Sequence, residues 1–370
     1  MQYIFFGAGK NSSRYVRILQ ELTGGDHLQC FVDNHHTGAV ICGKPVIDFS
    51  ELKKVHKKYI ILLTVSKPRF VAEIASQLQS AGIPFELFDN RFCLRLLKEK
   101  IAQNSEYYQQ YKKEIDYMLQ AGQVEMIPYP CRKKYLNQAV EVQYVSESDL
   151  YCYHLSNDKK LFFPRTPDRT PDENVKQIQS TIRNLLTEQD ISSPHRYFTP
   201  RHRVNDGDVF VDIGAAEAMT SLEVVDKASK VYVFEGEERW KAALQATFAS
   251  YDDKVVIVDK FVSDHDDEQN VKMDTFFKDI EGNMFIKVDI EGSERSFLRG
   301  AEKTLQRKGT KISLCVYHYP QDAEEFMPLF QNWGYRCELS PGWLFVWGDF
   351  AHGVMYGQLA TSTAKRRSIS

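Results

Sequence analysis

Short apolar runs alternate with segments of helical periodicity, and this alternation restricts the fold of the chain more than any other feature of its sequence. In the N-terminal third, the apolar runs lie at residues 3–6, 28–32, 59–65 and 85–88, with amphipathic segments at about 12–22 and 69–81. Short, continuously apolar strands between helices are typical of a parallel sheet that is buried on both faces. We therefore expect residues 1–95 to form a doubly wound α/β domain.

The same alternation returns in the C-terminal half, with apolar runs at residues 208–213, 230–235, 255–258, 285–290 and 312–316. Two closing runs, 335–339 and 343–347, are separated by only three residues. Because so short a connection cannot hold a parallel crossover, we expect these two runs to pair with each other as antiparallel strands. The pattern predicts a second α/β domain over residues 191–355 and a polar, frayed tail over 356–370.

Residues 96–190 differ in character from both flanking regions. A polar, helix-favouring stretch over 94–123 is followed by β-rich runs at 140–145, 150–155 and 160–163, a turn at Asn157–Asp158 and a helix over about 173–188. Strand, polar turn and strand in succession are typical of a hairpin. The whole chain thus reads as α/β, with two Rossmann-like doubly wound sheets joined by a helical and β-hairpin segment.

Charge and cysteine usage exclude several classes of protein. The net charge is −3, from 47 Lys and Arg against 50 Asp and Glu, so no overall basic field favours nucleic acid as a partner. The longest apolar stretch, 59–65, is far shorter than the roughly 20 residues that span a bilayer, and the first residues do not resemble a signal peptide. The seven cysteines include no CxxC pair, so we expect no metal site. We expect a cytoplasmic protein, and a homo-oligomer stays open.

The turn after the run at 208–213 is the segment most suited to bind a ligand. Its small residues Gly214, Ala215 and Ala216 allow close approach to the backbone, and the carboxylates of Asp212 and Glu217 flank them. A dinucleotide pyrophosphate is repelled by such acids, whereas the ammonium and sulfonium groups of S-adenosylmethionine (SAM) are attracted by them.

Glu235 lies 21 residues beyond Gly214, at the end of the next apolar run. An acid at this spacing binds ribose hydroxyls in both NAD and SAM enzymes, so alone it discriminates poorly. The antiparallel pair expected at the end of the sheet favours the SAM fold.

Residues from about 192 to 350 resemble the FkbM family of class I SAM-dependent methyltransferases. The resemblance rests on five blocks, namely 193–197 (SPHRY), 212–217 (DIGAAE), 233–235 (VFE), 285–294 (FIKVDIEGSE) and 316–318 (VYH) followed by Asp322. It implies a seven-stranded sheet with a reversed last strand, SAM at the carboxyl ends of the strands, and O-methylation of sugars or related metabolites.

Three polar residues at the ends of the fourth and fifth C-terminal strands are the predicted catalytic residues. Asp289 and Glu291 follow the fourth strand and His318 follows the fifth, so they should converge on one crevice. For O-methylation the acceptor hydroxyl must lose a proton, which His318 or Asp289 could take. Alternatively, Asp289 and Glu291 cap the following helix, where the helix dipole favours acids. We expect Glu294 to support that helix, and Asp289 to contact the cofactor as well.

Two further pairs are assigned by position. His195 and Tyr197 precede the methyltransferase core and could fold over the pocket as a lid. Ser263 and Asp264 follow the third strand and would fall near the adenine. Ala218 stands where the resembled family commonly has Gly; we expect a helical conformation there, in which Ala is harmless.

The N-terminal domain carries its own glycine turn. Gly7 and Gly9 follow the first strand, and Asp33 lies 24 residues beyond Gly9, which fits the context of a dinucleotide fingerprint although the third glycine is missing. Residues 43–47 (GKPVI) resemble a segment in the N-terminal Rossmann-like domains of bacterial sugar acyltransferases, which implies nucleotide-sugar binding. Gly7, Gly9 and Asp33 could hold a nucleotide or nucleotide-linked sugar, or the domain could serve as a scaffold.

Taken together, the sequence predicts a SAM-dependent methyltransferase that O-methylates a sugar or glycan precursor in bacterial surface polysaccharide biosynthesis. Its acceptor would be a small molecule or glycan, including a nucleotide-sugar. One alternative is an NAD(P)-dependent sugar-nucleotide oxidoreductase or epimerase that uses the first glycine turn. Another is a non-catalytic protein that binds SAM or a nucleotide-sugar.

Overall fold

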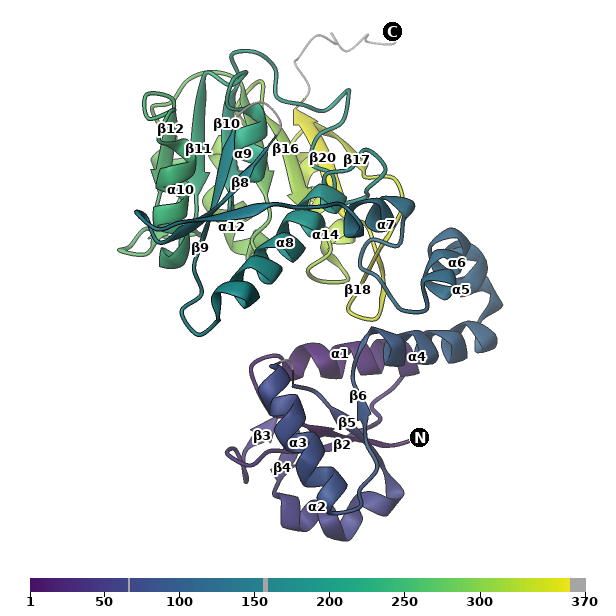
Figure 1. The fold of residues 1–370 in the computed structure, drawn as a ribbon. Coiled ribbons are helices and arrows are strands. Elements are labelled where there is room, and N and C mark those ends of the chain that lie inside the picture. Colours follow the sequence, from purple (N-terminus) through teal and green to yellow (C-terminus); the bar gives the residue numbers. More distant parts are fainter. Residues whose placement is uncertain (66, 156–158, 360–370) are drawn as a thin grey trace, which may run out of the picture. The chain divides into compact units, whose positions relative to one another are not determined.

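The computed structural model describes residues 1–65, 67–155 and 159–359, which divide into two units (Figure 1). Unit 1 comprises residues 1–128 together with 345–351, and unit 2 comprises the rest of the described chain. Both units are mixed α/β structures with mainly parallel sheets, as predicted. No helix in the described part of the chain is both long and apolar enough to cross a membrane.

Unit 1 contains a six-stranded sheet in the order β3-β4-β2-β1-β5-β6. Its strands are β1 (Tyr3–Phe6), β2 (Leu28–Val32), β3 (Val40–Ile41), β4 (Lys44–Ile47), β5 (Ile60–Leu63) and β6 (Glu86–Leu87). All neighbours are parallel except β3 and β4. The helices of this part are α1 (Ser12–Thr23), α2 (Phe49–Val55), η1 (His56–Lys58) and α3 (Pro68–Ser80). Because β1 is buried over its whole length, helices can cover both faces of the sheet. The four predicted strands and two predicted helices are confirmed.

Three helices follow in unit 1 where one connecting helix was expected. They are α4 (Asn90–Gln103), α5 (Ser105–Gln110) and α6 (Lys112–Ala121). The break at Asn104 arises because its side chain accepts a hydrogen bond from the backbone N–H of Tyr107 and so caps α5. Helix α4 runs across the domain boundary that we placed at residue 95.

A hairpin from the C-terminal part of the sequence completes unit 1. Its strands β18 (Leu344–Val346) and β19 (Asp349–Ala351) form a separate two-stranded sheet. The Tyr107 hydroxyl donates to Asp349, and the ring of Tyr111 stacks on Phe350 at 4.2 Å between centroids. Tyr107 and Tyr111 of the helical stretch therefore serve as packing partners for this hairpin.

Unit 2 begins with α7 (Pro130–Leu136) and a three-stranded antiparallel sheet of β7 (Val142–Val145), β8 (Leu150–His154) and β9 (Lys160–Pro164). This sheet confirms the predicted antiparallel element, while the turn expected at Asn157–Asp158 lies outside the described residues. Helix α8 (Pro171–Glu188) follows. The side chains of Thr170 and Glu173 each bond the backbone N–H of the other residue, which fixes the start of α8.

A seven-stranded sheet in the order β12-β11-β10-β15-β16-β20-β17 forms the centre of unit 2 (Figure 1). Its strands are β10 (Val209–Ile213), β11 (Lys230–Phe234), β12 (Val255–Val258), β15 (Met284–Val288), β16 (Lys311–Cys315), β17 (Tyr335–Leu339) and β20 (Val354–Leu359). Five strands are mutually parallel neighbours, and β20 is antiparallel to both β16 and β17. The seven strands and the reversed last strand agree with what the resemblance implied.

The predicted pairing of residues 335–339 with 343–347 is wrong. Strand β17 pairs instead with β20, because the chain between them leaves the sheet to form the hairpin of unit 1. Strand β20 runs through the domain end that we placed at residue 355. Tyr356 is buried in it and pairs with Ser313 and Glu338, so the end of the sheet depends on residues that the sequence pattern assigned to the tail.

Short elements and helices complete unit 2: α9 (Met219–Val224), η2 (Glu238–Trp240), α10 (Lys241–Phe248), β13 (Phe261–Val262), β14 (Asn270–Val271), α11 (Met273–Phe276), α12 (Glu294–Gly300), α13 (Glu302–Leu305) and α14 (Asp322–Asn332). On one face of the sheet, Val211, Ile286 and Leu314 pack with Phe297 and Phe326 of α12 and α14. Alternate residues of the same strands point to the opposite face. The carboxyl ends of β10, β15 and β16 lie in register at one edge, where their loops form the candidate site.

Candidate functional site

A buried ion pair lies beneath the glycine turn of unit 2. Asp212 and Lys287 are register partners on β10 and β15, with Lys287 Nζ 2.9 Å from Asp212 Oδ1. Lys287 also donates to the carbonyl oxygen of Gly214 at 2.6 Å, and the Ser221 hydroxyl donates to Asp212 Oδ2 at 2.7 Å. Burial lowers the pKa of Lys287, but the carboxylates of Asp212 and Asp289 outweigh it and raise that pKa above its usual value.

Asp212 supports the turn, and its role as a direct cofactor ligand stays a prediction. Its side chain has an exposed fraction of 0%, and its two oxygens face Lys287 and Ser221. The spacing correctly placed an acid at the strand end. What it could not show is that Lys287 on the neighbouring strand lies opposite this acid.

Gly214 needs its glycine because the turn meets the next strand end closely. Its φ is +73°, and a Cβ there would lie 1.9 Å from the carbonyl oxygen of Asp289. The backbone N–H groups of Gly214 and Ala215 both donate to the carbonyl oxygen of Phe234. The turn is thus held between β11 and β15.

Glu235 lies at this turn, as the spacing predicted. Its Oε2 accepts a hydrogen bond of 2.9 Å from the backbone N–H of Ala216. Its Oε1 accepts one of 2.8 Å from the backbone N–H of Glu237. The structure therefore brings together the small residues 214–216 and the acid proposed to bind ribose. Glu217 is buried beside them, and burial raises its pKa to about 7.

The expectation of a helical Ala218 is wrong. Ala218 has φ +59° and stands just before α9, where its N–H donates to the carbonyl oxygen of Ala215 at 2.7 Å. Ala216 (φ +46°) and Glu291 (φ +53°) are also left-handed, a conformation that costs roughly 1–2 kcal/mol for a residue with a Cβ. Three strained residues thus lie in loops of the candidate site, where such strain is often found.

Asp289 is the meeting point of three aromatic side chains. Its Oδ2 accepts a 2.7 Å hydrogen bond from the Tyr197 hydroxyl and lies 3.8 Å from His195 Nε2, while its Oδ1 lies 3.4 Å from His318 Nε2. His195 Nε2 is also 3.0 Å from the Tyr317 hydroxyl. The predicted lid residues His195 and Tyr197 therefore do reach the strand ends, and both are buried.

His318 is oriented by a second carboxylate. Its Nδ1 lies 2.8 Å from Oε1 of Glu294, which is fully buried, and its Nε2 lies 3.9 Å from Oε2 of the exposed Glu291. Burial lowers the pKa of His318, but Glu294, Asp289 and Glu291 outweigh burial and raise that pKa to about 8. Burial dominates at His195 and lowers its pKa to about 4 despite the nearby Asp289. The pKa values of the two histidines beside Asp289 are therefore shifted in opposite directions.

Glu188, the last residue of α8, was missed by the sequence reasoning. Burial and then the charges of Asp289 and Glu217 raise its pKa to about 8, so this carboxyl faces the same group of acids. Its only sequence signal is its position five residues before the block at 193–197. A helix end that looks like a connector gives no indication of facing a site.

Ser263 and Asp264 have partners on α12 rather than at the glycine turn. The Ser263 hydroxyl lies 3.2 Å from that of Ser296, and Asp264 pairs with Arg299 at 2.8 Å. A Cβ on Gly236 would lie 2.5 Å from the ring of Phe261, whose exposed fraction is 48%. Phe261 thus presents an aromatic surface beside Gly236, the residue that follows Glu235. The sequence reasoning missed Phe261.

The glycine turn of unit 1 is closed by its acid in the same manner. Asp33 Oδ2 accepts a hydrogen bond from the backbone N–H of Ala8 at 3.0 Å. Its Oδ1 accepts hydrogen bonds from the backbone N–H groups of His35 and His36 at 2.8 and 3.1 Å. Burial raises the pKa of Asp33, but these hydrogen bonds outweigh it and lower the pKa below its usual value. Gly7 has φ +124°, whereas a Cβ on Gly9 would meet open space. The structure thus brings Gly7 and Asp33 together, as predicted.

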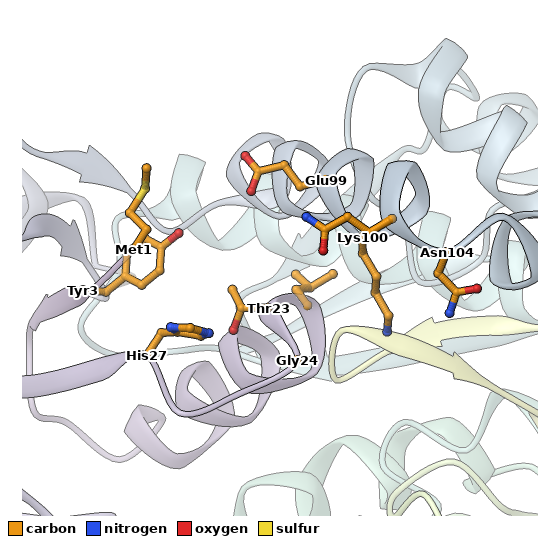
Figure 2. A pocket seen from close by; sticks show the side chains of 10 residues that line it. Met1, Tyr3, Thr23, Gly24, His27, Glu99, Lys100 and Asn104 are labelled. Carbon is orange, nitrogen blue, oxygen red and sulfur yellow. The ribbon is translucent and has the colours of Figure 1, made fainter.

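A cavity of about 380 Å³ in unit 1 lies elsewhere (Figure 2). It is lined by Met1, Tyr3, Leu22, Thr23, Gly24, His27, Glu99, Lys100, Gln103 and Asn104. Tyr3 begins β1 and His27 precedes β2, so the cavity is at the amino ends of these strands. The predicted nucleotide turn follows their carboxyl ends, where parallel sheets usually bind ligands.

Two sets of side chains at Asp289 have the geometry to hold a metal ion. They are His195, Asp289 and Cys315, and Asp289, Glu291 and His318; within each set the ligand atoms lie within 4.8 Å of one another. The sequence predicted no metal site because these residues have no recognisable ligand spacing. Their convergence comes from the register of β15 and β16.

Residues 200–337 match the family model described as the Methyltransferase FkbM domain. No curated protein matches the chain significantly.

Several solved structures are similar to this chain. A methyltransferase FkbM from Methylobacillus flagellatus KT has 16% identity and a TM-score of 0.40, covering 96% of this chain and 89% of its own. A putative methyltransferase from Streptococcus mutans, in complex with SAH, has 14% identity and a TM-score of 0.30, covering 42% and 91%. A putative tRNA (m1A22) methyltransferase from Streptococcus pneumoniae, in complex with S-adenosyl-L-methionine, has 13% identity and a TM-score of 0.30, covering 44% and 71%.

The resemblance of residues 1–95 to sugar acyltransferases stays a prediction. The family match lies entirely in unit 2 and includes the loops after β10, β11, β15 and β16. Residues 200–337 of this chain are therefore similar to the methyltransferase FkbM domain.

Proposed function

We propose that the protein is a SAM-dependent methyltransferase that methylates a hydroxyl group of its acceptor. The observation that carries this proposal is the Glu235 carboxylate at the backbone of the glycine turn, within a domain that matches a methyltransferase family. An acid so placed accepts hydrogen bonds from ribose hydroxyls. The small residues 214–216 allow the cofactor to approach the backbone.

The charges at the strand ends suit a cationic cofactor. Glu217 and Asp289 stand near Lys287 at the ends of β10 and β15. The ammonium and sulfonium groups of SAM would be stabilised by such carboxylates. Ser263 and Asp264 stay assigned to the adenine side, where Phe261 adds an aromatic surface for stacking.

Acceptor activation is assigned to Asp289 and His318, with Glu291 at the exposed rim. The acceptor oxygen attacks the methyl carbon, the carbon–sulfur bond breaks, and the sulfonium becomes the neutral thioether of S-adenosylhomocysteine (SAH). The hydroxyl proton passes to Asp289 or to His318. Glu294 orients the His318 ring through its contact with Nδ1 of that ring. Tyr197 and His195 fix the position of Asp289.

The acceptor class and the role of unit 1 extend this proposal. We assign a sugar or glycan precursor of bacterial surface polysaccharide as acceptor, in the cytoplasm, on the resemblance of the motif blocks. Unit 1 would bind a nucleotide or nucleotide-sugar at Gly7, Gly9 and Asp33.

Calorimetric titration with SAM and SAH, with NADH and NADPH as controls, tests the proposal without knowledge of the acceptor. We expect saturable SAH binding that Glu235→Ala abolishes and Asp33→Ala, the matched change at the turn of unit 1, leaves intact. Binding of NADH or NADPH instead, lost in Asp33→Ala, would move the active centre to unit 1 and support an oxidoreductase.

A further inference from the structure

Three ligand atoms converge at the carboxyl ends of β15 and β16. His318 Nε2 lies 3.4 Å from Asp289 Oδ1 and 3.9 Å from Glu291 Oε2, and all three atoms lie within 4.8 Å of one another. Both oxygens belong to carboxylates, which accept hydrogen bonds and donate none when ionised. A positive charge between these atoms would stabilise the group.

The contact with Glu294 orients the His318 ring so that Nε2 faces Asp289 and Glu291. Its Nδ1 lies 2.8 Å from Oε1 of the fully buried Glu294. The backbone N–H groups of Ile290 and Gly292 point at the same oxygen, at 3.3 and 3.4 Å. A carboxylate that receives the proton of one imidazole nitrogen, and so directs the other to a cation, is the usual arrangement around metal-binding histidines.

Asp289 provides a second observation. Its Oδ1 is buried and forms no hydrogen bond among the described residues, with His318 Nε2 3.4 Å away, whereas Oδ2 accepts from the Tyr197 hydroxyl. A buried polar atom without a hydrogen bond needs an explanation, and a bound ion is one of them. The oxygen in question is the one that faces His318 and Glu291.

We propose that Asp289, Glu291 and His318 bind one divalent transition metal ion at the acceptor side of the methyl-transfer site. One imidazole nitrogen with two carboxylates suits ions of the Mn²⁺ and Fe²⁺ class. Three protein ligands leave coordination positions open to oxygen atoms of the acceptor. The exposed side chain of Glu291 gives the ion a path from solvent.

The role of this ion rests on the proposed function. With the ion bound, Asp289 and His318 would serve as its ligands instead of accepting the proton. An acceptor hydroxyl bound to the ion would lose its proton to solvent more readily, because the cation stabilises the alkoxide. The alkoxide then attacks the methyl carbon, forming the carbon–oxygen bond as the carbon–sulfur bond of SAM breaks. The products are the methyl ether, SAH and one proton.

Mn²⁺ binding to the full chain after treatment with a chelator tests the site without any acceptor. Electron paramagnetic resonance of free Mn²⁺ and calorimetry should both report one saturable site. Glu291→Gln and His318→Gln should each weaken it by about tenfold or more, as expected for the loss of a ligand. Glu268→Gln, the same change at an exposed acid beside Asp266 and Asp267, should leave it unchanged.

SAH titration of the same samples separates this inference from the proposed function. Glu291 is exposed, so Glu291→Gln should fold normally and bind SAH as the wild type does. Saturable SAH binding with no saturable Mn²⁺ site, or with an Mn²⁺ affinity equal in wild type, Glu291→Gln and His318→Gln, would overturn the metal site and leave the methyltransferase. Loss of SAH binding from the wild type would overturn the proposed function, whatever Mn²⁺ does.

Discussion

The mainly parallel sheets of the two units contain the same backbone arrangement at the end of β1 and of β10, the first strand of each sheet along the chain. In each unit, a glycine turn follows this strand, and an acid after the next strand accepts a hydrogen bond from a backbone N–H group of the turn. Asp33 accepts from Ala8 in unit 1, and Glu235 accepts from Ala216 in unit 2. The spacing that predicted a ligand site in each unit is therefore a real structural signal. It reports how the turn is closed, and this alone does not distinguish a site from a scaffold.

The two turns differ in the atoms that surround them and in the charge of the strand that precedes them. A Cβ on Gly7 would meet a side-chain atom of Val65 at 2.6 Å, whereas one on Gly214 would meet the backbone oxygen of Asp289 at 1.9 Å. Strand β1 in unit 1 has the sequence YIFF, without a charge, while β10 holds the buried Asp212. Unit 2 thus adds a buried charge to the shared arrangement, which the first strand of unit 1 lacks.

The largest expected effect comes from the charge beneath the turn of unit 2. Asp212→Ala leaves Lys287 buried without its partner, which should lower the free energy of unfolding by about 3–5 kcal/mol. Asp33→Ala, at the matching acid of unit 1, removes hydrogen bonds to a partly exposed carboxylate and should cost only about 1–2 kcal/mol.

Denaturant unfolding followed by tryptophan fluorescence measures both changes. Trp240, Trp333 and Trp343 report on unit 2, and Trp347 reports on unit 1. Equal losses in the two variants would show that the ion pair beneath the turn adds nothing, and the contrast between the units would fail.

A second, smaller effect is expected from pH. His202 is buried in unit 2 between the rings of Phe285 and Tyr356, and burial lowers its pKa to about 4. Because the folded pKa lies below the unfolded value of about 6.5, protonation favours unfolding, and stability is lost as pH falls from 6.5 towards 4. Raised carboxyl pKa values at Glu188 and Glu217 act in the opposite direction, so only a difference between variants isolates His202.

The stability difference between the wild type and His202→Phe should therefore change by about 2 kcal/mol between pH 7.5 and 5.0, in favour of the variant at the lower pH. Denaturant unfolding at the two pH values measures it. A difference that does not change with pH would mean that His202 is protonated equally in the folded and unfolded states.

The sequence predicted the parallel strands of both sheets because their apolar runs are continuous and separated by helical segments. It did not predict that the chain leaves the sheet after β17, because a three-residue connection between two apolar runs looks the same in a hairpin of the sheet and in an excursion. Within the site, strand-end residues such as Asp289 and His318 could be predicted, since parallel strands end at one edge. The pairing of Asp212 with Lys287 depends on strand order and register, which one sequence does not reveal.

The smallest effect concerns backbone strain, which unit 2 concentrates beside its turn. Ala218 has φ +59°, so Ala218→Gly should raise the free energy of unfolding by about 1 kcal/mol, the gain from removing a left-handed Cβ less the added freedom of the unfolded chain. Ala215→Gly is the matched control, because Ala215 is not among the left-handed residues and should lose about 0.5–1 kcal/mol. Calorimetric unfolding with SAH titration of both variants measures stability and affinity together. A gain in Ala218→Gly with unchanged SAH affinity would show that the strain is incidental to binding, whereas a gain with weaker affinity would show that the left-handed Cβ shapes the cofactor site.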